Sequence, residues 1–215
     1  MSTITMNPPH ADARFWNRIA ARYARKAVPD QAAYETKLRK TNGYLNITDR
    51  VLEIGCGTGS TALHHASRVA SVLGTDISPR MIDIAREKAR AAGADNVAFE
   101  VSSVEDLESA PTPYDVIMAH SILHLVEDVP ATLQRLHRLL KPGGLLISNT
   151  QCIGDSARWL GWVAPTGRRL GVLPRVNVFQ EATFLRGSKM QALPWRKSGN
   201  RNPKPATTWW PARFN

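Results

Sequence analysis

The sequence predicts an α/β fold, with a doubly wound and mostly parallel sheet that carries helices on both faces. Two observations support this prediction. Short apolar runs of strand length alternate along the chain with segments of helical periodicity. The first of these strands leads directly into a glycine-rich loop and a helix, an arrangement typical of parallel α/β units. At 215 residues, the chain has the length of one domain.

The predicted elements are two N-terminal helices followed by five strands with helices between them. Proline and glycine mark the ends of one helix, since Pro79 suits a first helical turn and Gly93 suits a helix end. The helices are expected at 12–26, 30–44, 60–68, 79–92 and 130–140. The strands are expected at 50–54, 69–75, 97–101, 114–119 and 145–148.

A loop rich in glycine follows the first strand, in the segment Glu53-Ile-Gly55-Cys-Gly57-Thr-Gly59. Glycine lacks a Cβ atom and tolerates positive φ, so a ligand can approach this backbone closely. The free N–H groups at the start of the next helix point toward the same place. Together these features predict a nucleotide-binding corner. The acidic Glu53 disfavours a phosphate there and suits a cation instead.

An aspartate, Asp76, ends the second apolar strand about 20 residues after the glycine loop. At the carboxyl end of that strand, its carboxylate can accept hydrogen bonds from both hydroxyls of a ribose. A nicotinamide dinucleotide site is the main competing interpretation. The fingerprint of such a site requires a third glycine where this chain has Ser60, and the pyrophosphate would meet Glu53.

This stretch resembles the first two motifs of class I S-adenosylmethionine-dependent methyltransferases, in which E/D-x-G-x-G-x-G holds the methionine part and an acidic residue holds the ribose. The turn Lys141-Pro-Gly-Gly144 before an apolar strand also matches this family. The resemblance covers about residues 12–185 and is closest to small-molecule enzymes of the ubiquinone/menaquinone methyltransferase type. It implies a Rossmann-like fold, S-adenosylmethionine as the methyl donor and a small-molecule acceptor. A non-catalytic S-adenosylmethionine-binding or assembly module is the alternative.

The resemblance also implies which residues hold the cofactor. They are Glu53, Gly55, Cys56, Gly57, Gly59, Asp76, Ile77, Met81, Ser103, Val104 and His120. Ser103 departs from the family pattern, since an aspartate usually meets the adenine amino group at this position. A serine hydroxyl accepts that hydrogen bond more weakly than a carboxylate does. Glu105 or Asp106 could take over this role.

Two histidines, His120 and His124, follow the fourth predicted strand, at the edge of the sheet where α/β folds keep their ligands. Both are candidates for catalysis. We expect His120 to line the site and His124 to be mainly a buried structural residue. The sulfonium of the implied donor is already an activated electrophile, so positioning can supply much of the catalysis without a protein base.

The chain outside the sheet provides candidates for covering the substrate. Tyr23 lies on the first helix, and Trp159 and Trp162 lie in an apolar segment after the fifth strand. We therefore divide the chain into four parts. They are an N-terminal helical cap at 1–45, an S-adenosylmethionine-binding core at 46–150, a substrate-covering insertion and helix at 151–185, and an irregular basic tail at 186–215.

The net charge of +10 suggests nucleic acid at first sight. However, residues 186–215 carry seven basic residues and no acidic one, and the other residues have 21 basic against 18 acidic side chains. We therefore expect no nucleic-acid partner. No apolar run is long enough to span a membrane, no signal peptide is evident, and Cys56 and Cys152 lack metal-ligand spacing. A cytoplasmic protein without a metal is expected, and the oligomeric state is left open.

The alternation of strands and helices stops from Gly187 onward. The resembled family has two further strands at this point, so we expect the last hairpin to be missing or disordered. One explanation is a shift of reading frame in the gene, because back-translation of residues 191–215 with permitted codons gives a strand–turn–strand pattern one base out of register. On this hypothesis, the sheet edge beside the fifth strand would be left unpaired.

Overall fold

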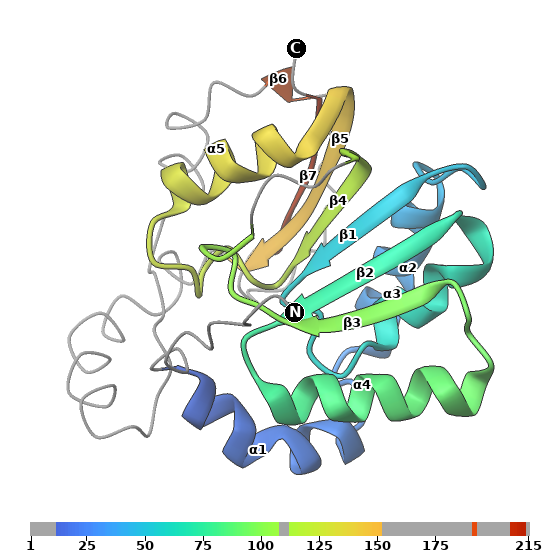
Figure 1. The fold of residues 1–215 in the computed structure, drawn as a ribbon, viewed down its shortest axis with the longest axis vertical. Coiled ribbons are helices and arrows are strands. Elements are labelled where there is room, and N and C mark those ends of the chain that lie inside the picture. The colour runs from blue at the N-terminus through green and yellow to red at the C-terminus, as the bar shows by residue number, and fades with distance from the viewer. Residues whose placement is uncertain (1–11, 108–111, 152–190, 193–206, 214–215) are drawn as a thin grey trace, which may run out of the picture.

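The computed structural model describes residues 12–107, 112–151, 191–192 and 207–213. Their central feature is a seven-stranded sheet with the strand order β3-β2-β1-β4-β5-β7-β6, seen in Figure 1. The first five strands are parallel to one another: β1 (Arg50–Ile54), β2 (Ser71–Asp76), β3 (Val97–Val101), β4 (Tyr114–His120) and β5 (Leu140–Gln151). The predicted Rossmann-like α/β fold is confirmed.

The helices occur where the sequence predicts them. They are α1 (Ala13–Arg25), α2 (Gln31–Asn42), α3 (Ser60–His65) with the 3-10 turn η1 (Ala66–Arg68), α4 (Pro79–Ala92) and α5 (Val129–Leu139). Side chains cap three of them: Asp30 before α2, Ser78 before α4 and Asp128 before α5. Asp12 precedes α1 but makes no capping hydrogen bond with its side chain. None of the described helices is long and apolar enough to cross a membrane.

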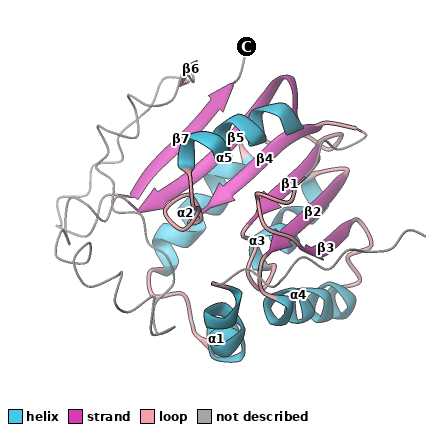
Figure 2. Ribbon diagram, turned by 60° about the vertical axis from the view of Figure 1, so that its left-hand side comes forward, coloured by secondary structure: helices cyan, strands magenta, loops and turns pink. Residues whose placement is uncertain are grey.

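Helices cover both faces of the sheet, and each face has its own apolar core (Figure 2). One core joins α5 to strand residues such as Leu52 and Ile117. The other joins α3 and α4 to Val51 and Val116, the neighbours of those residues along the chain. Because successive side chains of a strand point to opposite faces, the apolar runs of β1 and β4 supply both cores.

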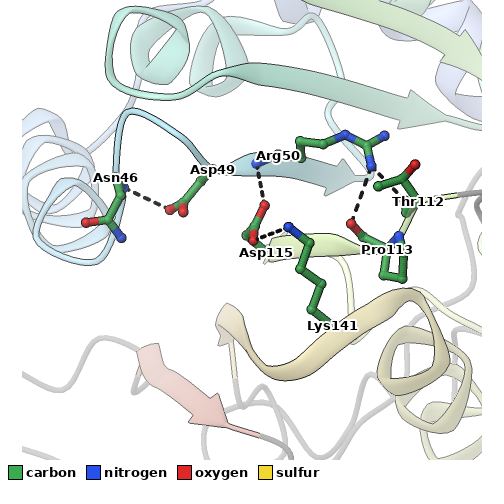
Figure 3. Close-up of polar contacts among 7 residues, drawn as sticks. All are labelled: Asn46, Asp49, Arg50, Thr112, Pro113, Asp115 and Lys141. Carbon is green, nitrogen blue, oxygen red and sulfur yellow. Dashed lines mark hydrogen bonds and ion pairs between the residues drawn. The ribbon is translucent and has the colours of Figure 1, made fainter.

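The amino-terminal ends of β1 and β4 are joined by polar contacts around Asp115, shown in Figure 3. One carboxylate oxygen of Asp115 accepts a hydrogen bond from the Arg50 N–H at 2.8 Å, and the other accepts one from Lys141 Nζ at 2.6 Å. The Arg50 guanidinium donates to the Thr112 carbonyl at 2.7 Å. These contacts help to hold the amino-terminal ends of the two central strands together. The carboxyl ends of β1 and β4 lie on the opposite side of the sheet. The strand order reverses between these two strands, and α/β sheets bind ligands beside such a point.

Helix α1 is anchored to the start of α4 by Asn17. Its Oδ1 atom accepts hydrogen bonds from Ser78 Oγ at 2.7 Å and from the Arg80 N–H at 3.2 Å. This attachment holds α1 near the carboxyl end of β2. As a result, Trp16 and Tyr23 of α1 face the glycine loop and the end of β2.

Strand β5 begins at Leu140 instead of Leu145, earlier than predicted. Leu140 already pairs with Tyr114 of β4, and the register shifts before Leu145 pairs with Val116. The expected turn thus forms an irregular part of the strand. Gly143, with φ of +73°, allows the backbone to make this irregularity.

The two C-terminal segments that the structure describes, 191–192 and 207–213, form strands, so the expectation that the last hairpin is missing or disordered is wrong for them. Strand β7 (Thr207–Arg213) pairs antiparallel with β5 along its whole length, and β6 (Gln191–Ala192) pairs antiparallel with β7. The run Thr-Thr-Trp-Trp at 207–210 is β-branched and aromatic, which favours a strand. The prolines and lysines before it obscure this pattern. Because β7 pairs with β5, the unpaired edge expected beside the fifth strand is not found, whereas the shifted reading frame itself stays a prediction.

Candidate functional site

The glycine loop turns sharply after β1, and its glycines have backbone angles that other residues rarely adopt. Gly55 has a φ of +63° and Gly57 a φ of +55°. A Cβ atom on Gly55 would lie 2.6 Å from the side chain of Ile122, so a larger residue would force a rearrangement. On Gly57 it would lie 3.9 Å from the ring of Tyr23. The loop therefore packs tightly against the segment after β4 and also faces α1.

Asp76 holds the glycine loop in place from the end of β2. Its Oδ2 atom accepts a hydrogen bond from the Gly57 N–H at 3.0 Å, and its Oδ1 atom accepts one from the Ser78 N–H at 2.9 Å. Burial raises the pKa of Asp76, and these two N–H groups oppose the rise. Each carboxylate oxygen can accept a further hydrogen bond. Asp76 can therefore order the loop and bind ligand hydroxyls at the same time.

A cavity lies beside the glycine loop, the end of β2 and α1, and we call it the Asp76 cavity. Its walls combine apolar side chains with acidic ones. They consist of Asp12, Trp16, Tyr23, Gly55, Gly57, Thr75, Asp76, Ile77, Met81, Ser102, Val104, Glu105, His120, Ser121, Ile122, Leu125, Val126 and Glu127. Seven of the eleven residues predicted to hold the cofactor come together here: Gly55, Gly57, Asp76, Ile77, Met81, Val104 and His120. A carboxylate beside apolar side chains suits a ribose joined to a flat base.

Two predicted residues, Ser103 and Gly59, lie outside the wall of the Asp76 cavity. The Ser103 hydroxyl donates to Asp106 Oδ2 at 2.7 Å and accepts from the Asp106 N–H at 3.1 Å, so Asp106 engages it. Glu105 lines the cavity instead and offers a carboxylate there. Gly59 packs closely against Phe99, which indicates a structural role.

A second cavity adjoins the first, and we call it the Lys37 cavity. It includes Glu53 and Cys56, the two remaining predicted cofactor residues. Unlike the first cavity, it is lined by three lysines: Lys26, Lys37 and Lys88. The residues common to both cavities are Tyr23, Gly55, Gly57, His120 and Ser121. Groups bound in the two cavities can therefore meet at these shared residues.

His120 lies at the junction of the two cavities, and it is buried. Burial lowers the pKa of His120 well below its usual value, so the ring is neutral at physiological pH and a weak base. The next residue, Ser121, has a φ of +53°. Such a conformation is costly for serine and is common at functional sites. His124 lines neither cavity, and burial lowers its pKa to about 4.

A further buried histidine, His65, lies at the end of α3. Its Nδ1 atom is 2.7 Å from the amide oxygen of Asn42, an acceptor, so Nδ1 carries the ring proton. Its Nε2 atom is buried without a hydrogen-bond partner among the described residues. Burial, with smaller contributions from His64 and Lys37, lowers the pKa of His65 to about 3.

Acid is therefore expected to destabilise the fold. In the unfolded chain, the imidazole rings of His65 and His124 take up protons near pH 6.5. In the folded chain, they do so only near pH 4 at His124 and near pH 3 at His65. The free energy of unfolding should fall as the pH drops from 7 to 5, with a slope approaching about 1.4 kcal/mol per pH unit for each ring. Urea denaturation measures this slope. It should become shallower in His65→Gln, and an unchanged slope in that variant would contradict the assignment.

The substrate-covering residues predicted from the sequence are only partly within the described chain. Tyr23 lines both cavities while half of its surface remains exposed. Trp159 and Trp162 lie outside the described residues. Lys37 and Lys88 line the second cavity but were not expected there, because lysines on helices usually face solvent. Among the described residues, no group of three or more His, Cys, Asp or Glu side chains could hold a metal ion.

Residues 45–170, more than half of the chain, match the family model described as a methyltransferase domain. The chain therefore belongs to this methyltransferase family. The class predicted from the glycine loop and Asp76 is confirmed by this match.

Several relatives of the chain are methyltransferases of different kinds. The chain is 41% identical over 99 residues to the tRNA 5-carboxymethoxyuridine methyltransferase of Escherichia coli (strain K12). This match covers 45% of this chain and 38% of that protein. It is 31% identical over 157 residues to the ubiquinone biosynthesis O-methyltransferase of Paracidovorax citrulli (strain AAC00-1), which covers 68% of this chain and 65% of that protein. The matches thus span less than two thirds of these relatives' lengths.

A solved structure confirms the fold over most of the chain. The N-methyltransferase NodS from Bradyrhizobium japonicum WM9, in complex with S-adenosyl-l-homocysteine, superposes with a TM-score of 0.73. The superposition covers 95% of this chain and 98% of that chain at 16% sequence identity. At this identity, the likeness concerns the fold alone.

Proposed function

We propose that the chain is an S-adenosylmethionine-dependent methyltransferase that acts on a small-molecule acceptor. The observation that carries this proposal is the Asp76 cavity, in which a carboxylate and apolar walls suit a nucleoside, joined to a second cavity at His120. Asp76 would accept hydrogen bonds from the ribose hydroxyls, while Ile77 and Met81 would pack on the nucleoside. When bound, S-adenosylmethionine supplies a sulfonium methyl that an acceptor lone pair attacks, as the carbon–sulfur bond breaks and leaves its electrons on sulfur.

The residues of the chain bring donor and acceptor together in this proposal and need not remove a proton. His120 lines the junction where the methyl group would be transferred, but its depressed pKa makes it a weak base. His124 lies outside both cavities and would be structural. We therefore assign His120 to orienting the reacting groups, and the ordered glycine loop to positioning the donor. Glu105, in place of Ser103, would accept a hydrogen bond from the adenine amino group.

The proposed acceptor is a small molecule rather than a nucleic acid. The basic excess of the chain lies in residues 186–215, and a relative from P. citrulli is named for ubiquinone biosynthesis. Tyr23, Trp159 and Trp162 are proposed to cover the acceptor. The division at 45, 150 and 185 and the cytoplasmic location stay predictions. The relative from E. coli is named for a tRNA substrate, so RNA is the alternative acceptor that an experiment has to exclude.

Transfer of a labelled methyl group tests this proposal. The protein would be incubated with methyl-labelled S-adenosylmethionine and a panel of catechols, hydroxyquinones and amines, and in parallel with unmodified tRNA. We expect label in a small molecule and none in tRNA. Label in tRNA would overturn the proposed acceptor class. If S-adenosylhomocysteine binds but no acceptor is labelled, a non-catalytic binding module would replace the enzyme.

A further inference from the structure

Helix α1 carries a row of basic residues along one face. Its four arginines, spaced three or four positions apart, share this face with the lysine that follows the helix. They are Arg14, Arg18, Arg22, Arg25 and Lys26, and all five are exposed. At about 3.6 residues per turn, they fall within roughly a third of the helix circumference. The helix itself contains no acidic residue that would offset their charge.

The packing of α1 directs this basic face away from the rest of the molecule. On the opposite side of the helix, Ala13 and Ala20 are buried, and Asn17 is bonded to Ser78 and Arg80 at the start of α4. Both ribbon views show α1 on the outside of the molecule beside α4 (Figures 1 and 2). The arginines are therefore presented together to whatever lies outside.

The charge of α1 contrasts with that of the α/β core. Residues 46–150 carry nine basic and thirteen acidic residues, so the core has a negative balance. A charge spread over the whole surface would mainly affect solubility, whereas charge gathered on one exposed element creates a local potential that attracts a partner of opposite sign. The partner of α1 is thus expected to be polyanionic.

A row of apolar side chains borders the basic face and narrows the choice of partner. Phe15, Ile19 and Tyr23 follow one another at intervals of four residues, so they lie on neighbouring turns. Phe15 and Ile19 are partly exposed, Tyr23 is 52% exposed, and Val28 just after the helix is 42% exposed. Arginines beside apolar and aromatic side chains are typical of helices that lie among lipid headgroups.

RNA also offers phosphates, but it is less well matched to this surface. Reading an RNA sequence requires polar side chains that reach base edges. The row beside the arginines is apolar, apart from the Tyr23 hydroxyl. A flat layer of anionic headgroups can meet all five basic residues at once and take up the apolar row at its boundary.

We propose that α1 docks the protein on an anionic phospholipid surface, with its basic face against the headgroups. This inference goes beyond the proposed function and does not depend on it, since it requires neither cofactor nor acceptor. Trp16 and Tyr23 of the same helix line the Asp76 cavity. Docking through α1 therefore brings that cavity next to the lipid, where an apolar acceptor would be concentrated.

Co-sedimentation of the full chain with lipid vesicles tests this proposal. One set of vesicles consists of phosphatidylcholine, and the other contains roughly one third phosphatidylglycerol, which makes the surface anionic. The wild type should bind the anionic vesicles at least about tenfold more tightly than the neutral ones. Raising the salt concentration should weaken this binding, because salt screens the attraction between exposed charges and the headgroups.

A triple variant of α1 removes most of the basic face, with the substitutions Arg14→Gln, Arg22→Gln and Arg25→Gln. Arg18 is kept because its guanidinium also lies 5.7 Å from the centre of the Phe15 ring. Partition onto the anionic vesicles should fall by roughly 10- to 100-fold, since each basic residue near such a surface adds several-fold. The melting temperature should not change, because the three positions are exposed and glutamine is a good helix former.

Matched variants separate the face of α1 from net charge. One control removes three exposed arginines from η1, α4 and α5 through Arg68→Gln, Arg90→Gln and Arg138→Gln. A second control neutralises part of the basic tail through Arg196→Gln, Lys197→Gln and Arg201→Gln. Both lose the same charge as the α1 variant and should stay within about threefold of the wild type. Lysine at the three α1 positions should restore binding.

Three results would overturn the role of α1. In the first, the wild type binds anionic vesicles no better than neutral ones. In the second, the α1 variant and either control lose equal affinity, which would show an effect of net charge or of the tail. In the third, the α1 variant loses binding to tRNA in a parallel filter assay but keeps its binding to vesicles, which would make the face an RNA site. The double variant Arg22→Gln/Arg25→Gln replaces the triple one if the latter does not fold, and it should lose at least about fivefold.

Discussion

Replacing Asp76 with alanine is expected to weaken the binding of S-adenosylhomocysteine by roughly 100-fold or more. The change removes the acceptors for the ribose hydroxyls, and hydrogen bonds to a charged group contribute about 1.5–3 kcal/mol each. It also releases the Gly57 and Ser78 N–H groups that Asp76 holds at 3.0 and 2.9 Å. The loop that carries the nucleotide-binding backbone would then lose its order. Isothermal calorimetry measures the effect.

Two controls sharpen the Asp76 prediction. Asp76→Asn keeps one oxygen acceptor without the charge, so its affinity should lie between those of the wild type and the alanine variant. Asp83→Ala removes a carboxylate from the exposed face of α4 and should not change the affinity. Affinity of Asp76→Ala within about threefold of the wild type would show that Asp76 does not bind the ribose.

Replacing Gly59 with alanine should cause one of the largest losses of stability in the molecule. Gly59 has a φ of +74°, and an added Cβ atom would lie 2.5 Å from Phe99 Cζ and 2.9 Å from the Ala85 Cβ. The backbone strain costs about 1–2 kcal/mol and the overpacking about 1–3 kcal/mol more. We therefore expect the free energy of unfolding to fall by roughly 2–5 kcal/mol, measured by urea denaturation.

Gly93→Ala is the matched control for Gly59→Ala. Gly93 ends α4 with a φ of +61°, but a Cβ atom there would have no neighbour within 4 Å. The free energy of unfolding of Gly93→Ala should therefore fall only by the strain of the left-handed backbone, about 1 kcal/mol. If the two variants lose equal stability, the close packing of Gly59 on Phe99 contributes nothing, and the structural role given to Gly59 is wrong.

Local signals explain why much of the fold could be predicted from the sequence. Strand β1 and helix α4 lie at the predicted bounds. The first is an apolar run that ends at glycine, and the second begins at Ser78-Pro79 and ends before Gly93. The position of Asp76 at the end of β2 could be predicted for the same reason, because the residue follows the glycine loop by about 20 residues.

Contacts between distant segments explain what the sequence could not reveal. Strand β7 forms because β5 offers an edge to pair with, and nothing near 207–213 in the sequence indicates that partner. The engagement of the Ser103 hydroxyl by Asp106 depends on the turn after β3. The place of Lys37 in a cavity depends on how α2 packs beside α3, and α2 by itself has the pattern of an exposed helix.

In the proposed function, the cavities beside the glycine loop bind S-adenosylmethionine rather than another nucleotide. Calorimetric titration of the wild-type protein with S-adenosylhomocysteine and with NAD under the same conditions tests it most directly. We predict one equivalent of S-adenosylhomocysteine bound with a Kd of roughly micromolar order, and NAD bound at least about 100-fold more weakly. Absence of binding by S-adenosylhomocysteine, or tighter binding of NAD, would contradict the claim.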